Sequence, residues 1–203
     1  MTTAPFAPQV TAAPAATAVG FKEWANVCEA LGTGAMSLIL RKGGIHEGRG
    51  GFEFKHPEFF LFPTWFHTQG EKLRWQAPDP ARFVFPPEEG RVSVDVDYVA
   101  RLEQVWRVTD WSKMEALAPF HAWTEEVVRE RFAYDEESCL NVALVRVHKL
   151  PQRWSFPYLK SHGGCRSWVA VPEPAAGWRE ALEPSLSDEA FASVKESVRN
   201  ILG

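Results

Sequence analysis

The sequence lacks several features that would assign it to a common protein class. Its three cysteines are odd in number and far apart, so it has no CxxC pair of the kind found in zinc knuckles and thioredoxin-type sites. This usage is typical of reduced thiols in a cytoplasm. No apolar run approaches the roughly 20 residues of a membrane span, and the N-terminus has no basic region followed by an apolar stretch. We therefore expect a soluble cytoplasmic protein without a signal peptide.

The sequence also lacks a strong excess of charge. Its formal net charge is −4 over 203 residues, so any binding of nucleic acid or another anion depends on a local basic patch. Aromatic residues are abundant, with nine Trp and fourteen Phe, and such residues most often fill hydrophobic cores. With 45% hydrophobic residues, the chain is long enough for one well-buried core.

The chain is expected to consist of a tail and one folded domain. Residues 1–19 are mostly Ala, Thr and Pro, without charge or apolar periodicity, which predicts a disordered tail. Residues 20–203 are predicted to form a single domain with Pro-rich excursions at 76–90 and 172–186.

Helical and strand patterns are mixed without a regular β-α-β rhythm. Apolar residues at helical spacing predict helices at 21–31, 111–117 and 122–132, and from Ser187 to the C-terminus. Strands are predicted at 36–40, 52–55, 59–62, 92–108, 140–147 and 165–171, with a bend or bulge in the long alternating segment 92–108. This mixture indicates an α+β fold with a largely antiparallel sheet, bent or half-barrel, on which several short helices pack.

The segment 38–68 gathers basic, glycine, histidine and aromatic residues. Glycines allow the backbone to approach a phosphate, basic side chains supply charge, and an aromatic ring stacks a base. The predicted ligand-binding residues are Arg41, Lys42, Gly43, Gly44, His46, Arg49, Lys55, Trp65 and His67. The local charge over 41–55 is only +2, and the glycines match neither a Walker A loop nor a dinucleotide fingerprint. The best hypothesis is a module that binds nucleic acid, a nucleotide or another phosphate-bearing ligand; an exposed hairpin with solvated charges is the competing interpretation.

A metal-dependent nuclease is one alternative. Glu53 and Lys55 are two residues apart in a predicted strand, which would place a carboxylate and an ammonium group on one face. A bound metal would then activate water for attack on a phosphodiester. The second acid that this chemistry requires is ambiguous: it would be Glu47, in a loop, or Asp95 or Asp97, later in the sequence.

A nucleophilic thiol is a second alternative. Cys165 follows two glycines whose N–H groups would form an oxyanion hole, and His162, His148 or His121 would be the base. A small residue that enters the last strand is the competing interpretation of this cysteine.

Two further interpretations concern metals and protein partners. His46, His56 and His67 are ten and eleven residues apart, which fits no familiar pair of metal ligands, so no metal site is predicted and no cofactor is indicated. A protein-interaction scaffold, with an exposed aromatic patch in place of a basic one, stays open as a third class.

Several long blocks together resemble a known family. They are LRKGGIHEGRGGFEFKHPEFFLFPTWFH with the preceding FKEWANVCEAL, then WTEEVVRERFAY, LVRVHKLP and GGCRSWVAV. Over about residues 21–171 the chain resembles domain-of-unknown-function family 1802, a family of uncharacterised prokaryotic proteins. The resemblance implies no activity and no catalytic residue.

Overall fold

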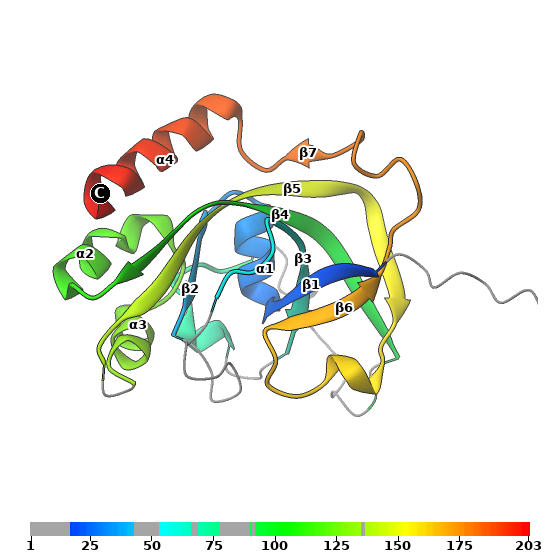
Figure 1. Cartoon of the computed structure of the whole chain (residues 1–203), viewed down its shortest axis with the longest axis horizontal. Coiled ribbons are helices and arrows are strands. Elements are labelled where there is room, and N and C mark those ends of the chain that lie inside the picture. The colour runs from blue at the N-terminus through cyan, green and yellow to red at the C-terminus, as the bar shows by residue number, and fades with distance from the viewer. Residues whose placement is uncertain (1–16, 43–52, 66–68, 78–89, 91, 135–136) are drawn as a thin grey trace, which may run out of the picture.

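The computed structural model describes residues 17–42, 53–65, 69–77, 90, 92–134 and 137–203. Within these residues the chain forms a mixed, mostly antiparallel sheet of seven strands that is not closed, together with four α-helices (Figure 1). The predicted α+β class is therefore confirmed.

The sheet has the strand order β2-β5-β4-β3-β1-β6, and β7 pairs with β5. Its strands are β1 (Thr17–Trp24), β2 (Leu38–Arg41), β3 (Glu58–Thr64), β4 (Ser93–Val108), β5 (Leu140–Pro157), β6 (Trp168–Pro172) and β7 (Glu183–Pro184). The α-helices are α1 (Ala25–Gly32), α2 (Trp111–Ala116), α3 (Glu125–Phe132) and α4 (Asp188–Leu202). In the part of the chain that the structure describes, the short 3₁₀ helices are η1 (Gln69–Lys72), η4 (Ala118–Phe120) and η5 (Lys160–His162). Only β1 and β3 pair in parallel among these strands.

The long strands β4 and β5 form the centre of the sheet and curve across the molecule (Figure 1). The strand predicted at 92–108 is confirmed, and the expected irregularities are the register shifts at Val96/Tyr98 and Leu102/Gln104. The prediction that the next strand ends before Pro151 is wrong, because β5 continues to Pro157. Pro151 lies inside the first register shift, where the ladder does not need the N–H that proline lacks.

The sheet is covered by apolar side chains on both faces, and β3 shows this most directly. Successive strand residues point to opposite faces. Phe59 and Leu61 join the larger hydrophobic cluster, which includes residues of α1 to α4, whereas Phe60 and Phe62 join a second cluster with residues of β4, β5 and β6. The strand predicted at 59–62 is therefore confirmed, and its side chains are buried on both faces of the sheet.

The N-terminal elements differ from the prediction. Residues 21–24 belong to β1 rather than to a helix, which begins only at Ala25. The reason is tertiary pairing: Gly20–Trp24 align with Phe60–Thr64 on one side, and Thr17–Phe21 align with β6 on the other. Consequently residues 17–19 of the expected tail are part of the sheet, and residues 1–16 lie outside the described residues.

Two of the predicted helices begin at capping side chains, whereas two of the predicted strands differ. The side chain of Asp110 accepts a hydrogen bond from Ser112 N at the start of α2, and Ser187 Oγ accepts one from Ala190 N at the start of α4. Residues 53–56 form no strand, which corrects the one predicted at 52–55. The last predicted strand begins at Trp168 instead of Cys165, and most of the excursion at 76–90 lies outside the described residues.

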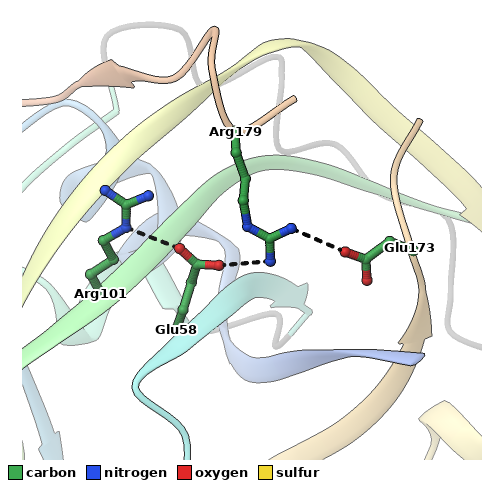
Figure 2. Close-up of polar contacts among 4 residues, drawn as sticks. All are labelled: Glu58, Arg101, Glu173 and Arg179. Carbon is green, nitrogen blue, oxygen red and sulfur yellow. Dashed lines mark hydrogen bonds and ion pairs between the residues drawn. The ribbon is translucent and has the colours of Figure 1, made fainter. Parts of the chain in front are cut away.

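The connector that follows β6 is bound to the sheet by a charge network (Figure 2). Glu58 accepts hydrogen bonds from Arg101 and from Arg179, each at 3.0 Å, and Arg179 also contacts Glu173 at 3.4 Å. Partial burial raises the pKa of Glu58, but the two arginines outweigh this effect and hold the pKa below its ordinary 4.5. The guanidinium of Arg179 lies over the ring of Trp178, a buried residue of the second cluster.

Candidate functional site

The carboxyl ends of three strands form one side of a pocket. Because β1 and β3 are parallel, their last residues lie at the same edge of the sheet. The pocket has a volume of about 390 Å³. On this side it is lined by Lys22, Trp24, Arg41, Phe62, Thr64 and Trp65.

The facing side of the pocket comes from the segment between β5 and β6. It consists of Tyr158, His162, Gly164, Cys165, Arg166 and Ser167, and we call the whole cavity the basic pocket. Because β1 pairs antiparallel with β6, residues more than 130 positions apart in the sequence meet across it.

Lys22 connects the two sides of the basic pocket. Its Nζ donates hydrogen bonds to the carbonyl oxygens of His162 and Gly164 at 2.8 and 2.7 Å, and its backbone N–H donates to Ser167 at 2.8 Å. Gly164 has a φ of 75°, a conformation that glycine adopts without strain. Lys22 therefore fixes the facing loop and brings a positive charge to the pocket wall.

Arg41 is held in place by a buried carboxylate. Its Nη2 lies 3.1 Å from Glu23 Oε2, and Glu23 is only 2% exposed. The guanidinium also stacks at 4.8 Å over the ring of Phe21, while its buried Nε–H has no hydrogen-bond partner among the described residues. A second hydrogen bond from Nη2 ends at the carbonyl oxygen of Lys22. These contacts orient a cation at the pocket and leave one donor unsatisfied.

Arg166 contributes the third cation and differs from the other two. It is exposed, and it makes no hydrogen bond or ion pair with any described residue. None of the described lining residues is acidic. Half-buried rings of Trp24, Trp65 and Tyr158 share the walls. The pocket therefore combines positive charge with flat aromatic surface.

The thiol of Cys165 is exposed at the pocket, as a nucleophile would need to be. His162, the nearest candidate base in the sequence, is 1% exposed, and its Nδ1 accepts a hydrogen bond from Leu159 N at 3.1 Å. In a neutral imidazole this places the proton on Nε2 and leaves no ring lone pair for the thiol proton. The geometry of His162 therefore does not provide the base, and the thiol nucleophile stays a prediction.

The predicted site residues are distributed over several places. Arg41, Trp65 and Cys165 line the basic pocket. Lys42 is directed elsewhere, with its Nζ bound to the carbonyl oxygens of Phe132 and Glu137. Lys55 is exposed and is not a lining residue. The remaining members of the predicted set lie outside the described residues: Gly43, Gly44, His46, Arg49 and His67.

The acids of the predicted nuclease site contact different parts of the described structure. The carbonyl oxygen of Glu53 accepts a hydrogen bond from Trp168 Nε1 at 3.3 Å, at the start of β6, and β1 and β3 separate β6 from β4, the strand that carries Asp95 and Asp97. These aspartates bind other partners: Ser155 Oγ contacts Asp95 at 2.6 Å, and an arginine of β5 contacts both oxygens of Asp97.

The described part of the chain contains no group of three His, Cys, Asp or Glu residues that could hold a metal ion. The nuclease site built from Glu53 and Lys55 with Asp95 or Asp97 stays a prediction.

Four basic or half-buried aromatic residues of the basic pocket were missed by the sequence analysis: Lys22, Trp24, Tyr158 and Arg166. Lys22 and Trp24 lay in a segment predicted as helix, where strand pairing was invisible. Arg166 directly follows Cys165, so the GGCR segment was the one signal that pointed to it. Tyr158 carried no signal.

The sequence matches an established family over most of its length. Residues 20–197 match the family described as Domain of unknown function (DUF1802). The chain belongs to this family. The matched part of the DUF1802 chain includes every lining residue of the basic pocket, from Lys22 to Ser167.

Two solved structures are similar to this DUF1802 chain. One is the crystal structure of ASCH from Zymomonas mobilis, at 11% identity and a TM-score of 0.43, covering 76% of this chain and 87% of that one. The other is a serine-to-alanine mutant of the same protein, at 12% identity and a TM-score of 0.41, covering 88% and 94%. No curated protein matches. Among the described residues, no helix has the length and apolar character to cross a membrane.

Proposed function

We propose that the basic pocket binds a nucleotide unit, either free or within a single strand of nucleic acid. The observation that supports this proposal most directly is that Lys22, Arg41 and Arg166 line one cavity of about 390 Å³ together with two indole rings and a phenol ring. This volume lies in the range of small-ligand pockets. The proposal moves the binding site from the whole segment 38–68 to a pocket that shares Arg41 and Trp65 with it.

The phosphate is assigned to Arg41 and Arg166. Arginine pairs bidentately with phosphate oxygens, and the guanidinium of Arg41 lines the pocket on a side chain that is 23% exposed. Arg166 is exposed and free to turn towards a ligand. Lys22 adds charge, although its Nζ also holds the facing loop.

The base is assigned to Trp65, with Trp24 and Tyr158 on the surrounding walls. Stacking of a base on an aromatic side chain contributes about 1–3 kcal/mol and tolerates any base, so we expect weak sequence preference. A duplex keeps its bases stacked inside, which favours single strands over duplexes for this pocket.

Fluorescence polarisation with labelled oligothymidine, oligouridine and a matched duplex tests the proposal. Binding of single strands is expected to weaken with salt because neutralised phosphates release counterions. Arg166→Glu is expected to abolish most of the affinity, and Arg166→Ala is expected to reduce the slope of log K against log salt by about 0.7. Free nucleotide monophosphates as competitors distinguish a nucleotide site from a strand site.

Matched controls separate the pocket from the general surface. Lys149→Glu changes the same charge at an exposed residue outside the pocket, and Trp106→Ala removes a half-buried indole outside it. Both are expected to bind normally, whereas Trp65→Ala is expected to bind about 5- to 150-fold more weakly, the equivalent of the stacking energy. If Arg166→Glu and Lys149→Glu bind equally well, or no nucleic acid or nucleotide binds at low salt, the proposal fails.

An aromatic interaction surface is less well supported. Among the described residues, the large hydrophobic side chains that are exposed are Val92, Val105, Tyr134 and Leu159, and only one of these is aromatic. The many Trp and Phe residues described are instead buried or half-buried.

A further inference from the structure

Arg131, in helix α3, lies against an aromatic residue of the basic pocket. Its guanidinium carbon is 5.5 Å from the ring centroid of Trp24, which lines the pocket, and 3.8 Å from that of Trp123. The two indole rings meet edge to face with their centroids 4.8 Å apart, so the guanidinium lies close to both. Arg131 therefore brings a further positive charge next to the three cations of the basic pocket.

The guanidinium of Arg131 has no anionic partner among the described residues. The residue is half-buried, yet it makes no hydrogen bond or ion pair with any of them. Burial lowers its pKa to about 10, so the side chain is still charged at pH 7. A charged group that is removed from water normally has a partner in a folded protein. Arg131 is therefore a cation that is available to an anionic ligand.

The buried carboxylate of Glu23 does not neutralise Arg131, because it already serves other groups. Its oxygens contact Arg41 Nη2 at 3.1 Å and the backbone N–H of Trp24 at 2.8 Å. Next to the effect of burial, Glu23 raises the pKa of Arg131 and Arg41 lowers it, so both act on this guanidinium. Glu130, which is exposed, adds a smaller attraction. Two guanidinium groups thus share one buried carboxylate, which leaves a net positive charge beside Trp24.

A second arginine of the same helix offers a direct comparison. Arg129 also stacks on an indole, with its guanidinium carbon 4.1 Å from the ring centroid of Trp111. Its Nη2, however, pairs with Glu115 at 3.6 Å and with Glu125 at 2.8 Å. Stacking occupies the face of a guanidinium and leaves the N–H groups at its edge for bidentate pairing with an anion. Two glutamates use this edge in Arg129, whereas no described residue uses it in Arg131.

We infer that Arg131 forms a second phosphate subsite beside the basic pocket, for the next phosphate of a single strand. The inference rests on the nucleotide site proposed above, in which Arg41 and Arg166 bind one phosphate. Trp24 connects the two subsites, and Arg131 binds the phosphate on the other side of the same sugar. Every internal nucleotide of a strand carries a phosphate on each side of its sugar. The ligand is therefore a strand and not a free mononucleotide.

Three thymidine compounds test this inference by isothermal titration with the full chain: the 5′-monophosphate, the 5′-diphosphate and the 3′,5′-bisphosphate. The bisphosphate has a phosphate on each side of the sugar and is expected to bind at least about tenfold more tightly than the monophosphate, the gain from one hydrogen-bonded charge pair. The diphosphate has both phosphates on one side and is expected to bind like the monophosphate. A diphosphate that binds as tightly as the bisphosphate would overturn the assignment to a strand.

Variants of α3 locate the second phosphate. Arg131→Met keeps an apolar chain against Trp123 but removes the charge, and it is expected to abolish the gain of the bisphosphate over the monophosphate. Arg129→Met makes the same change at the other stacked arginine and is expected to leave this gain intact. Arg131→Lys keeps the charge at this position but pairs with only one phosphate oxygen, so the gain is expected to fall at least about threefold. Because this comparison does not depend on Arg131→Met folding, an unchanged gain in Arg131→Lys by itself contradicts the bidentate contact.

Arg166→Glu distinguishes failure of this inference from failure of the nucleotide site. If Arg166→Glu weakens the monophosphate but the bisphosphate gains nothing, or keeps its gain in Arg131→Met, the second subsite alone is overturned. If none of the three compounds binds and no strand binds, or if Arg166→Glu changes nothing, the nucleotide site and the second subsite fail together.

Discussion

The pair formed by Arg41 and Glu23 is the part of the basic pocket whose energetics follow most directly from the structure. The carboxylate of Glu23 is 2% exposed, and its oxygens contact Arg41 Nη2 at 3.1 Å and the backbone N–H of Trp24 at 2.8 Å. Replacing Arg41 with Met keeps much of the apolar stem but removes the cation. The buried carboxylate then loses its paired cation, although it still interacts electrostatically with Arg131. Removing one partner of a buried ion pair destabilises a protein by about 3–5 kcal/mol.

A double-mutant cycle measures this coupling. Glu23→Gln is expected to cost less, about 1–2 kcal/mol, because Arg41 is 23% exposed and solvent in the pocket hydrates it. Combining Arg41→Met with Glu23→Gln is expected to recover about 2–3 kcal/mol relative to the sum of the single changes. Urea unfolding of the four proteins supplies the free energies. If Arg41→Met costs less than about 1 kcal/mol and the coupling is near zero, the ion pair does not orient Arg41 as described.

Three further predictions concern the core. Gly32→Ala is expected to destabilise the protein by about 1–3 kcal/mol, because an added Cβ would overlap the ring of Tyr98 and disturb its 2.9 Å hydrogen bond to Glu29. Urea unfolding measures this loss, and an unchanged midpoint of the urea transition would show that the ring moves away freely. Trp178→Ala is expected to cost about 3–5 kcal/mol, because this buried ring packs on Phe60 at 5.0 Å, and a smaller loss would mean that the connector is not part of the core. The pKa of His121 is about 4 in the folded protein, below its ordinary 6.5, because burial disfavours the charged ring. The free energy of unfolding is therefore expected to keep its full value above pH 6.5 and to fall by about 3 kcal/mol as the pH falls towards 4. His121→Phe is expected to flatten this part of the plot of unfolding free energy against pH.

The elements that the sequence predicted well are those whose signals are local. The alternation over 92–108 needs only one buried face, and the caps Asp110 and Ser187 bind backbone groups within three residues. The helix predicted over Phe21–Trp24 was wrong for the opposite reason. Its apolar spacing was compatible with the following helix, and only pairing with β3 and β6, which are distant in the sequence, makes it a strand.

The candidate site depended almost entirely on such distant pairing. Arg41 and Trp65 were found because they lie in one segment that is rich in basic, glycine, histidine and aromatic residues. Lys22 and Arg166, in contrast, meet only because β1 and β6 are neighbours in the sheet. The same segment also misled, since Lys42 and Lys55 follow Arg41 in the sequence without sharing its pocket. The number of basic residues in a segment does not show in which direction each side chain points.

Photo-crosslinking tests the central claim, that the basic pocket binds a nucleotide unit, most directly. A single strand that contains 5-bromouridine is irradiated with the full chain at low salt, and the attached peptides are identified by mass spectrometry. The account predicts crosslinks at Trp65, Trp24 or Tyr158, which disappear in Arg166→Glu and persist in Lys149→Glu. Crosslinks confined to residues outside the basic pocket, or equally strong in both variants, would contradict it.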